Sequence, residues 1–167
     1  GIVISASHNP FVDNGIKFFG GDGYKLPDVV EDALEKLVHG LLAHDEAARP
    51  IGRQIGIVEY RDDLLNQYVD YVESTCRERL DGMRIVLDCA NGAAYEAMPR
   101  VLRRLGADLK VIHALPNGVN INDNCGSTHM ESLRRTVLET GADIGIAHDG
   151  DADRCLCLDE RGEVIDG

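Results

Sequence analysis

The stretch that decides the fold is Gly145-Ile146-Ala147-His148-Asp149-Gly150-Asp151-Ala152-Asp153-Arg154. An apolar run typical of a buried strand leads into it, and a second strand-like run occupies residues 155–158. Between the two expected strands, aspartates stand at three alternate positions. In an extended or tightly turned backbone, the side chains of residues i, i+2 and i+4 converge on one side. The sequence therefore predicts a cluster of carboxylates at the end of a buried strand.

The carboxylates of Asp149, Asp151 and Asp153 repel one another at short range unless a cation lies between them. Hard oxygen ligands suit Mg²⁺ or Ca²⁺ better than zinc. The guanidinium of Arg154 adds a fixed positive fork that suits a phosphate oxygen. A metal beside an arginine at the end of a strand indicates a site for phosphate chemistry.

Two other interpretations of this acidic loop stay open at this point. It can be a solvated surface loop without function, or a calcium-binding loop of the EF-hand type. Asp149, Asp151, Asp153 and Glu160 match positions 1, 3, 5 and 12 of the EF-hand pattern. Position 6 of that pattern requires glycine for a sharp turn, however, and Arg154 occupies it here. The flanking runs also read as strands, whereas an EF-hand loop lies between helices, so the calcium loop is disfavoured.

The composition bounds the class of protein. The chain has 167 residues, of which 44% are hydrophobic, and this suffices for one domain or two small ones with a real core. A net charge of −12 disfavours nucleic acid and anionic membrane surfaces as partners, and no apolar run approaches the ~18 residues of a membrane span. The five cysteines, with Cys155 and Cys157 alternating like small core residues, favour a reducing cytoplasm. The oligomeric state does not follow from the sequence.

Hydrophobic periodicity predicts an α/β chain with two domains. We expect strands over residues 1–5, 16–19, 54–60, 84–89, 108–112, 144–147, 155–158 and 163–165, the first of them buried. We expect helices over residues 28–44, 62–80, 94–105 and 131–139. A turn at Asp81-Gly82 marks a domain boundary, so the expected domains are 1–80 and 81–167. Strand patterns that reach almost to both ends favour a piece of a longer protein.

A second polar motif follows the first expected strand: Ser5-Ala6-Ser7-His8-Asn9-Pro10. A serine close to a histidine can be an activated nucleophile. The alternative is a simple turn that Asn9-Pro10 ends, because these residues favour turns and bond their own backbone. The next expected strand places Lys17 near the same loop, either as a functional cation or as an ordinary exposed strand residue.

Both motifs resemble one family of enzymes, the α-D-phosphohexomutases. Residues 5–10 are similar to the phosphoserine loop of that family, and residues 149–154 are similar to its metal loop. The spacing of about 140 residues fits as well. Softer stretches most resemble the bacterial phosphoglucosamine mutase family, and they lie at residues 13–19, 88–95, 120–122 and 125–129. The resemblance extends over essentially the whole chain.

The resemblance implies a four-domain enzyme of which this chain holds the C-terminal part of domain 1 and most or all of domain 2. Each of these domains would be a three-layer α/β/α sandwich on a mixed, mostly parallel sheet. Ser7 would carry a phosphoryl group and hand it to glucosamine 6-phosphate, which would form a bisphosphate intermediate and then glucosamine 1-phosphate. Asp149, Asp151 and Asp153 would hold Mg²⁺ together with an oxygen of the Ser7 phosphate.

The same resemblance assigns roles to the residues around these groups. Arg154 would stabilise the phosphoryl group, His8 and Lys17 would be candidates for proton handling, and Ser5 would tune the sugar preference. Ala152 stands where the family often has glycine, and we expect metal binding to survive the extra methyl group. Two alternatives remain: a phosphomannomutase or phosphoglucomutase, and a non-catalytic module that binds a metal or phosphate. The presence of Ser7 with all three aspartates favours a catalytic site.

Overall fold

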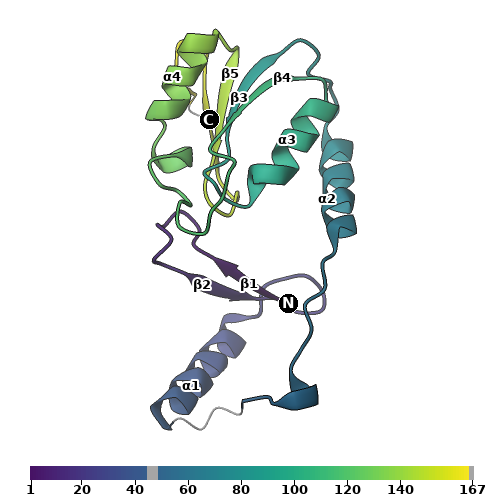
Figure 1. Cartoon of the computed structure of the whole chain (residues 1–167), viewed down its shortest axis with the longest axis vertical. Helices are drawn as coiled ribbons and strands as arrows, with labels where there is room; N and C mark the ends of the chain where they lie inside the picture. Colours follow the sequence, from purple (N-terminus) through teal and green to yellow (C-terminus); the bar gives the residue numbers. More distant parts are fainter. Residues whose placement is uncertain (45–48, 166–167) are drawn as a thin grey trace. The chain divides into compact units, whose positions relative to one another are not determined.

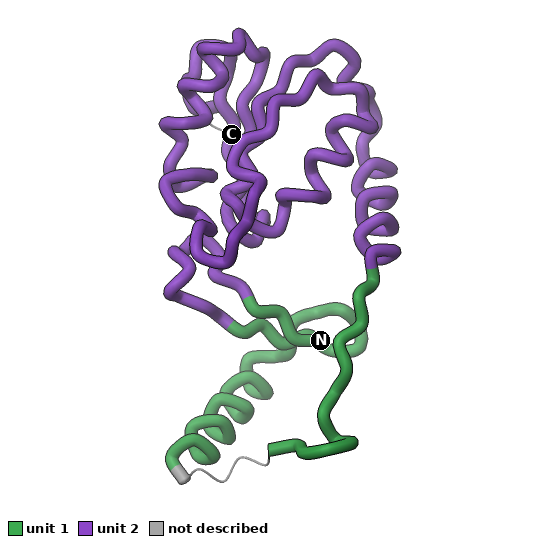
Figure 2. The backbone as a smooth tube through the Cα atoms, in the orientation of Figure 1, with its two compact units in different colours: residues 1–4, 16–61 green, residues 5–15, 62–167 purple. Residues whose placement is uncertain are grey.

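A computed structural model of the chain describes residues 1–44 and 49–165. It divides into two compact units, shown in different colours in Figure 2. The first unit holds residues 1–4 and 16–61, and the second holds residues 5–15 and 62–167. The serine-rich loop therefore belongs to the second unit, although it lies near the start of the chain. Within the described residues, no helix has both the length and the apolar character that a membrane crossing requires.

The first unit contains most of a two-stranded sheet and one long helix. Strands β1 (Ile2–Ser5) and β2 (Gly15–Phe18) form a two-stranded sheet, and helix α1 (Asp28–His44) follows, as expected from its periodicity. Asp28 and Glu31 lie in the first turn of α1, where carboxylates interact favourably with the positive end of the helix dipole. A short 3₁₀ helix, η1 (Gly52–Gln54), comes after the helix.

Two expectations for the first unit are wrong. The strand over residues 1–5 is present but not buried: Ile2 is 67% exposed and Ile4 is 72% exposed, because β1 pairs only with β2 among the described residues. The expected strand over residues 54–60 does not form. Apolar residues favour a strand only where a second strand satisfies the backbone, and in the described part of the chain none pairs with this segment.

The second unit is built on a five-stranded mixed sheet. Its strands are β3 (Arg84–Asp88), β4 (Asp108–Ile112), β5 (Ile144–His148), β6 (Cys155–Leu158) and β7 (Val164–Ile165). Their order in the sheet is β4-β3-β5-β6-β7. Strand β3 is parallel to both β4 and β5, while β6 is antiparallel to β5 and to β7. One strand, β6, thus runs against the other four, and two of the strand pairings in the described residues are parallel and two antiparallel, so the sheet is mixed.

Helices cover both faces of this sheet (Figure 1). Helix α4 (Glu131–Thr140) packs on one face, where Val86 of β3 meets Leu133 and Val137. Helix α3 (Ala94–Arg104) packs on the other face, where Leu102 joins neighbouring residues of β3, and helix α2 (Asp62–Thr75) packs against α3. Successive residues of β3 are buried on opposite faces, as period-two alternation requires. The expected three-layer α/β/α sandwich is confirmed for this unit.

Two details of the second unit differ from expectation. Helix α2 ends at Thr75 rather than near Leu80, and the backbone N–H of Leu80 donates to the carbonyl oxygen of Leu105 just after α3. Cys155 is exposed and Cys157 half-buried. Side chains alternate along a strand, and Leu158, which lies on the opposite face of β6 from both cysteines, is the buried residue and packs under α4. The domain boundary near residue 81 stays a prediction.

We predict that Leu133→Ala lowers the free energy of unfolding by about 2–5 kcal/mol, because it leaves a cavity between α4 and the sheet. Leu133 is fully buried, whereas Leu138 lies on the same helix with 54% of its surface exposed. Leu138→Ala is therefore the matched control, with an expected loss below about 1 kcal/mol. Urea unfolding followed by circular dichroism measures both changes. Equal losses in the two variants would contradict the packing of α4 described above.

Candidate functional site

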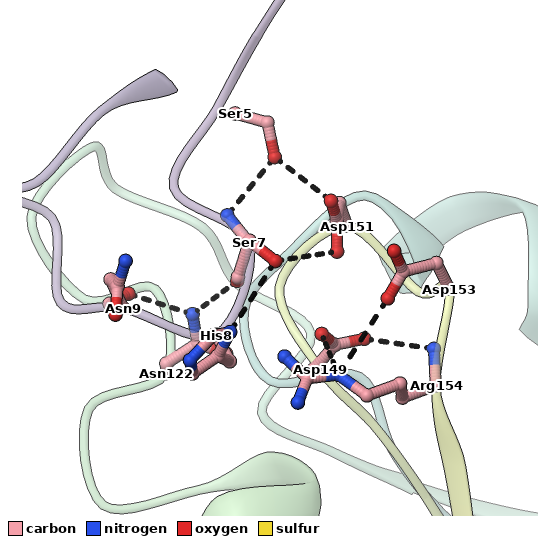
Figure 3. Close-up of polar contacts among 9 residues, drawn as sticks. All are labelled: Ser5, Ser7, His8, Asn9, Asn122, Asp149, Asp151, Asp153 and Arg154. Carbon is pink, nitrogen blue, oxygen red and sulfur yellow. Dashed lines mark hydrogen bonds and ion pairs between the residues drawn. The ribbon is translucent and has the colours of Figure 1, made fainter. Parts of the chain in front are cut away.

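Four loops of the second unit meet at one edge of its sheet. Three of them leave the C-terminal ends of β3, β4 and β5, which lie at the same edge because these strands are parallel. The fourth is the loop over residues 5–10, which faces the acidic loop after β5 (Figure 3). Crevices at the C-terminal ends of parallel strands are the usual location of ligand sites in α/β folds.

The acidic loop brings its three aspartates together. One carboxylate oxygen from each of Asp149, Asp151 and Asp153 lies within 4.8 Å of the others. Asp149 is fully buried, Asp151 is half-buried and Asp153 is exposed. The cluster thus runs from the interior of the unit to its surface, and its outer side is open to an approaching ligand.

Arg154 supplies one positive charge to this cluster. Its Nε lies 3.1 Å from Oδ2 of Asp149 and 3.7 Å from Oδ1 of Asp153, and its backbone N–H donates to Oδ1 of Asp149 at 3.2 Å. One guanidinium among three carboxylates leaves an excess of negative charge around a fully buried carboxylate, which is unfavourable without a further cation. The all-oxygen donor set fits a hard divalent cation such as Mg²⁺ or Ca²⁺.

The two serines of the N-terminal loop contact the same carboxylate. The hydroxyl of Ser5 donates to Oδ2 of Asp151 at 3.1 Å, and that of Ser7 donates to Oδ1 at 3.4 Å. The backbone N–H of Ser7 donates to the Ser5 hydroxyl oxygen at 3.0 Å. Ser5 therefore orients the backbone of Ser7, and both hydroxyls lie beside the acidic cluster.

His8 and Lys17 lie in different units. Nδ1 of His8 is 3.5 Å from Oγ of Ser7, and the ring is exposed. It also lines a cavity of about 430 Å³. The cavity is also lined by Phe11 and by residues of the loop between β4 and α4, among them Val119, Ile121, Asn124 and His129. Lys17 lies on β2 in the first unit, so its role beside Ser7 stays a prediction.

Sequence reasoning missed two residues that fix these loops. Nδ2 of Asn122 donates to the carbonyl oxygens of Ser7 and Asn9, each at 2.8 Å. Gly150 allows a close approach, because a Cβ at this position would collide with the carbonyl oxygen of Ser7. Asn122 lies 115 residues from Ser7, and a polar loop rich in asparagine does not reveal which amide has a distant partner. Gly150 lies inside the acidic motif, and its place in that motif is the sequence signal that could have identified it.

A second group of metal-ligand types lies nearby, formed by Asp88, His113 and Cys125. Its carboxylate is already occupied: Oδ1 accepts from the N–H of Ala90 at 2.9 Å, and Oδ2 accepts from Nδ1 of His113 at 2.9 Å and from the N–H of Gly126 at 3.0 Å. Burial and, secondarily, the charge of Asp88 raise the pKa of Cys125 to about 12. The thiol of Cys125 is therefore protonated at neutral pH without a bound metal, and the hydrogen bonds of Asp88 hold the surrounding loops together.

The last residue of β5, His148, adds no positive charge to the acidic cluster. The side chain is buried, and neither ring nitrogen has a hydrogen-bond partner among the described residues. Burial lowers the pKa of this imidazole, although the nearby backbone of Arg154 and the carboxylates of Asp149 and Asp88 oppose the shift. The ring is therefore neutral at pH 7, which leaves Arg154 to offset the aspartates.

Two family models match the chain. Residues 1–44 match the phosphoglucomutase/phosphomannomutase α/β/α domain I, and residues 60–162 match domain II of the same family. Curated relatives include the phosphoglucosamine mutases of Symbiobacterium thermophilum and Desulforamulus reducens, each 54% identical over all 167 residues, and that of Mycobacterium marinum at 53%. The chain spans about 37% of the length of each of these relatives.

Solved structures share the fold. A phosphoglucomutase/phosphomannomutase family protein from Burkholderia thailandensis superposes with a TM-score of 0.70 at 24% identity, over 98% of this chain and 34% of that one. An N-acetylglucosamine-phosphate mutase of the α-D-phosphohexomutase superfamily gives a TM-score of 0.57 at 16% identity, over 98% of this chain and 45% of that one. At these identities the likeness is evidence for the fold alone.

We predict that Asp151→Asn weakens the binding of a divalent cation about tenfold or more, because it removes one negative charge from the centre of the cluster. Asp108→Asn is the control, since it removes the same charge from an exposed position at the start of β4. Isothermal titration of Mg²⁺ into the parent and both variants measures the affinities. Equal affinity for the parent and Asp151→Asn would refute the assignment of the cluster as a metal site.

Proposed function

Because the chain belongs to the phosphoglucomutase/phosphomannomutase family, we propose that it is the part of a phosphoglucosamine mutase that carries the phosphorylated serine and the metal loop. The reaction would interconvert glucosamine 6-phosphate and glucosamine 1-phosphate through a bisphosphate intermediate. The observation that supports this most is the meeting of the Ser7 hydroxyl with the carboxylate of Asp151, which lies 144 residues further along the chain. A serine whose only role is to form a turn would not require a hydrogen bond to a carboxylate of a cation site.

In this proposal Asp149, Asp151 and Asp153 hold Mg²⁺ together with an oxygen of the Ser7 phosphate. The bound ion supplies positive charge that offsets the negative charge spread over a phosphoryl group during transfer. Arg154 holds Asp149 in place through two hydrogen bonds, and half of its side chain stays exposed, which leaves guanidinium N–H groups for a phosphoryl oxygen.

The serine and its neighbours carry out the transfer itself. The bond between phosphorus and Oγ of Ser7 breaks while a bond forms between phosphorus and a hydroxyl oxygen of the sugar phosphate. The proton of that hydroxyl passes to a base, for which His8 and Lys17 are the candidates. The oxygen of Ser7 takes up a proton as its bond to phosphorus breaks, and His8 lies beside this leaving oxygen, with its Nδ1 3.5 Å from Oγ of Ser7. Ser5 would act on the sugar preference through the orientation of this loop.

The choice of glucosamine phosphate rests on the relatives, which are named phosphoglucosamine mutase and are 52–54% identical to this chain. A full-length protein that contains the chain should therefore show a higher kcat/KM for glucosamine 6-phosphate than for mannose 6-phosphate or glucose 6-phosphate. A preference for either of the latter would favour the phosphomannomutase or phosphoglucomutase alternative. Turnover of none of the three would favour the non-catalytic module.

We predict that the phosphate resides on Ser7 and not on Ser5. In the full-length protein, mass spectrometry of a peptide covering residues 5–10 should find phosphate on Ser7. Ser7→Ala should lower kcat by roughly 10³-fold or more, because no oxygen remains to carry the phosphoryl group. The comparison variant, Ser5→Ala, should still acquire phosphate on Ser7. Phosphate on Ser5 alone, or full activity of Ser7→Ala, would overturn the assignment.

We also predict that the isolated 167-residue chain does not catalyse the mutase reaction. Holding an attacking hydroxyl in line can supply roughly 7–11 kcal/mol of the barrier to transfer. The described residues supply the phosphoryl-donor side of the site, and the chain spans only about 37% of its relatives. Conversion of glucosamine 6-phosphate should stay at background even with Mg²⁺ and a hexose bisphosphate primer. Measurable turnover would show that this chain alone positions the substrate.

A further inference from the structure

We propose that Asn122 is a positioning residue that holds Ser7 in the conformation from which its hydroxyl faces the aspartate cluster. The functional part of this proposal rests on the proposed function, since it concerns the same phosphoryl transfer. The observations that lead to it are the two hydrogen bonds of the Asn122 amide, the backbone conformation of Ser7, and the loops that fix Asn122 itself.

The amide of Asn122 is committed to the serine loop. Both of its N–H groups donate, one to the carbonyl oxygen of Ser7 and one to that of Asn9, each at 2.8 Å. The opposite amide orientation would set its oxygen against two carbonyl oxygens, so the orientation follows from the partners. The side chain is 7% exposed, and its Oδ1 has no hydrogen-bond partner among the described residues. A buried acceptor without a partner destabilises the fold, so what this amide contributes is its pair of donors to the loop.

Ser7 needs such support because its backbone is strained. Its φ of 51° lies in the left-handed region, which is unfavourable for a serine and persists only where the surroundings enforce it. The peptide groups on both sides of Ser7 are held: its N–H donates to Oγ of Ser5, and its carbonyl oxygen accepts from Asn122. Without the Asn122 bonds the backbone could relax toward φ below zero, which would turn the Ser7 hydroxyl away from Asp151.

Asn122 is itself fixed by neighbouring loops. Its backbone N–H donates to the carbonyl oxygen of Ala90 at 2.9 Å, in the loop after β3. Its own φ of 57° is a left-handed conformation that asparagine adopts readily. A Cβ on Gly150 would lie 2.7 Å from Nδ2 of Asn122, so the metal loop packs directly against the amide. The amide therefore connects the serine loop, the loop after β3 and the metal loop (Figure 3 shows its bonds to the serine loop).

Two variants remove the donors in different ways, and a third is the control. Asn122→Gly tolerates the left-handed backbone but has no amide, and Asn122→Asp keeps the shape of the side chain but sets a carboxylate against two carbonyl oxygens. Asn124→Gly is the matched control: Asn124 is also left-handed, with a φ of 51°, and its amide donates to Asp123 rather than to the serine loop.

The first measurement is phosphoryl transfer in the full-length protein that contains this chain. The protein is phosphorylated with glucose 1,6-bisphosphate, and transfer to glucosamine 6-phosphate is followed in single turnovers and in the steady state. We expect both Asn122 variants to lower the transfer rate roughly 10- to 100-fold, because the phosphoryl group on Ser7 is misplaced relative to the attacking hydroxyl, with KM within about twofold of the parent. Asn124→Gly should keep the parental values. A parental transfer rate in Asn122→Gly would overturn the proposal.

The second measurement needs no turnover, and it separates this proposal from the proposed function. Hydrogen exchange is followed by mass spectrometry in the same proteins. The peptide covering residues 5–10 should exchange faster in Asn122→Gly than in the parent, while peptides from α4 should exchange at the parental rate. Unchanged exchange in residues 5–10, or faster exchange throughout the second unit, would overturn the positioning role. An inactive parent with faster exchange confined to the loop would overturn only the proposed function.

Discussion

The parallel pairing of β3 with β4 and β5 is the constraint on which the site depends. It brings three loops to one edge of the sheet, where their backbone groups need partners. The carboxylate of Asp88 provides several of them, since it accepts hydrogen bonds from Ala90, Gly126 and His113. These bonds connect the loops that follow β3 and β4. As a result, Asn122 and the acidic loop are held in fixed positions beside Ser7.

The acidic loop shows how local structure and electrostatics are combined. Asp149 directly follows β5 and is fully buried, so its charge must be matched inside the fold. The guanidinium of Arg154, in the same loop, balances the charge of Asp149. The hydroxyls of Ser5 and Ser7 donate hydrogen bonds to Asp151 from the serine loop. Ala152 lies between the ligands with a φ of 59°. That left-handed conformation is the physical reason why glycine suits this position, and alanine occupies it at some cost in backbone strain.

Much of the second unit is predictable from sequence because its signals are local. Period-two and period-3.6 patterns define β3, β5, α3 and α4, and Gly141 ends α4 in the left-handed conformation expected of a helix stop. The alternate spacing of the aspartates likewise predicts that their carboxylates converge, because all three lie in a single loop. The exposure of β1 and the absence of a strand over residues 54–60 were not predictable, since both depend on what packs beside those segments. The contact of Asn122 with Ser7 was not predictable either, because it joins residues 115 positions apart.

The grouping of residues 5–15 with residues 62–167 has a consequence for the newly made protein. Ser7 precedes Asp151 by 144 residues, and ribosomes add about 5–20 residues per second, so the serine loop emerges about 7–29 s before its carboxylate partner exists. Closing so long a loop costs entropy that the intervening chain cannot offset until β3, β4 and β5 are paired. The site is therefore completed only after the acidic loop has been made, and a nascent chain that stalls before that loop carries the serine without a cation site beside it.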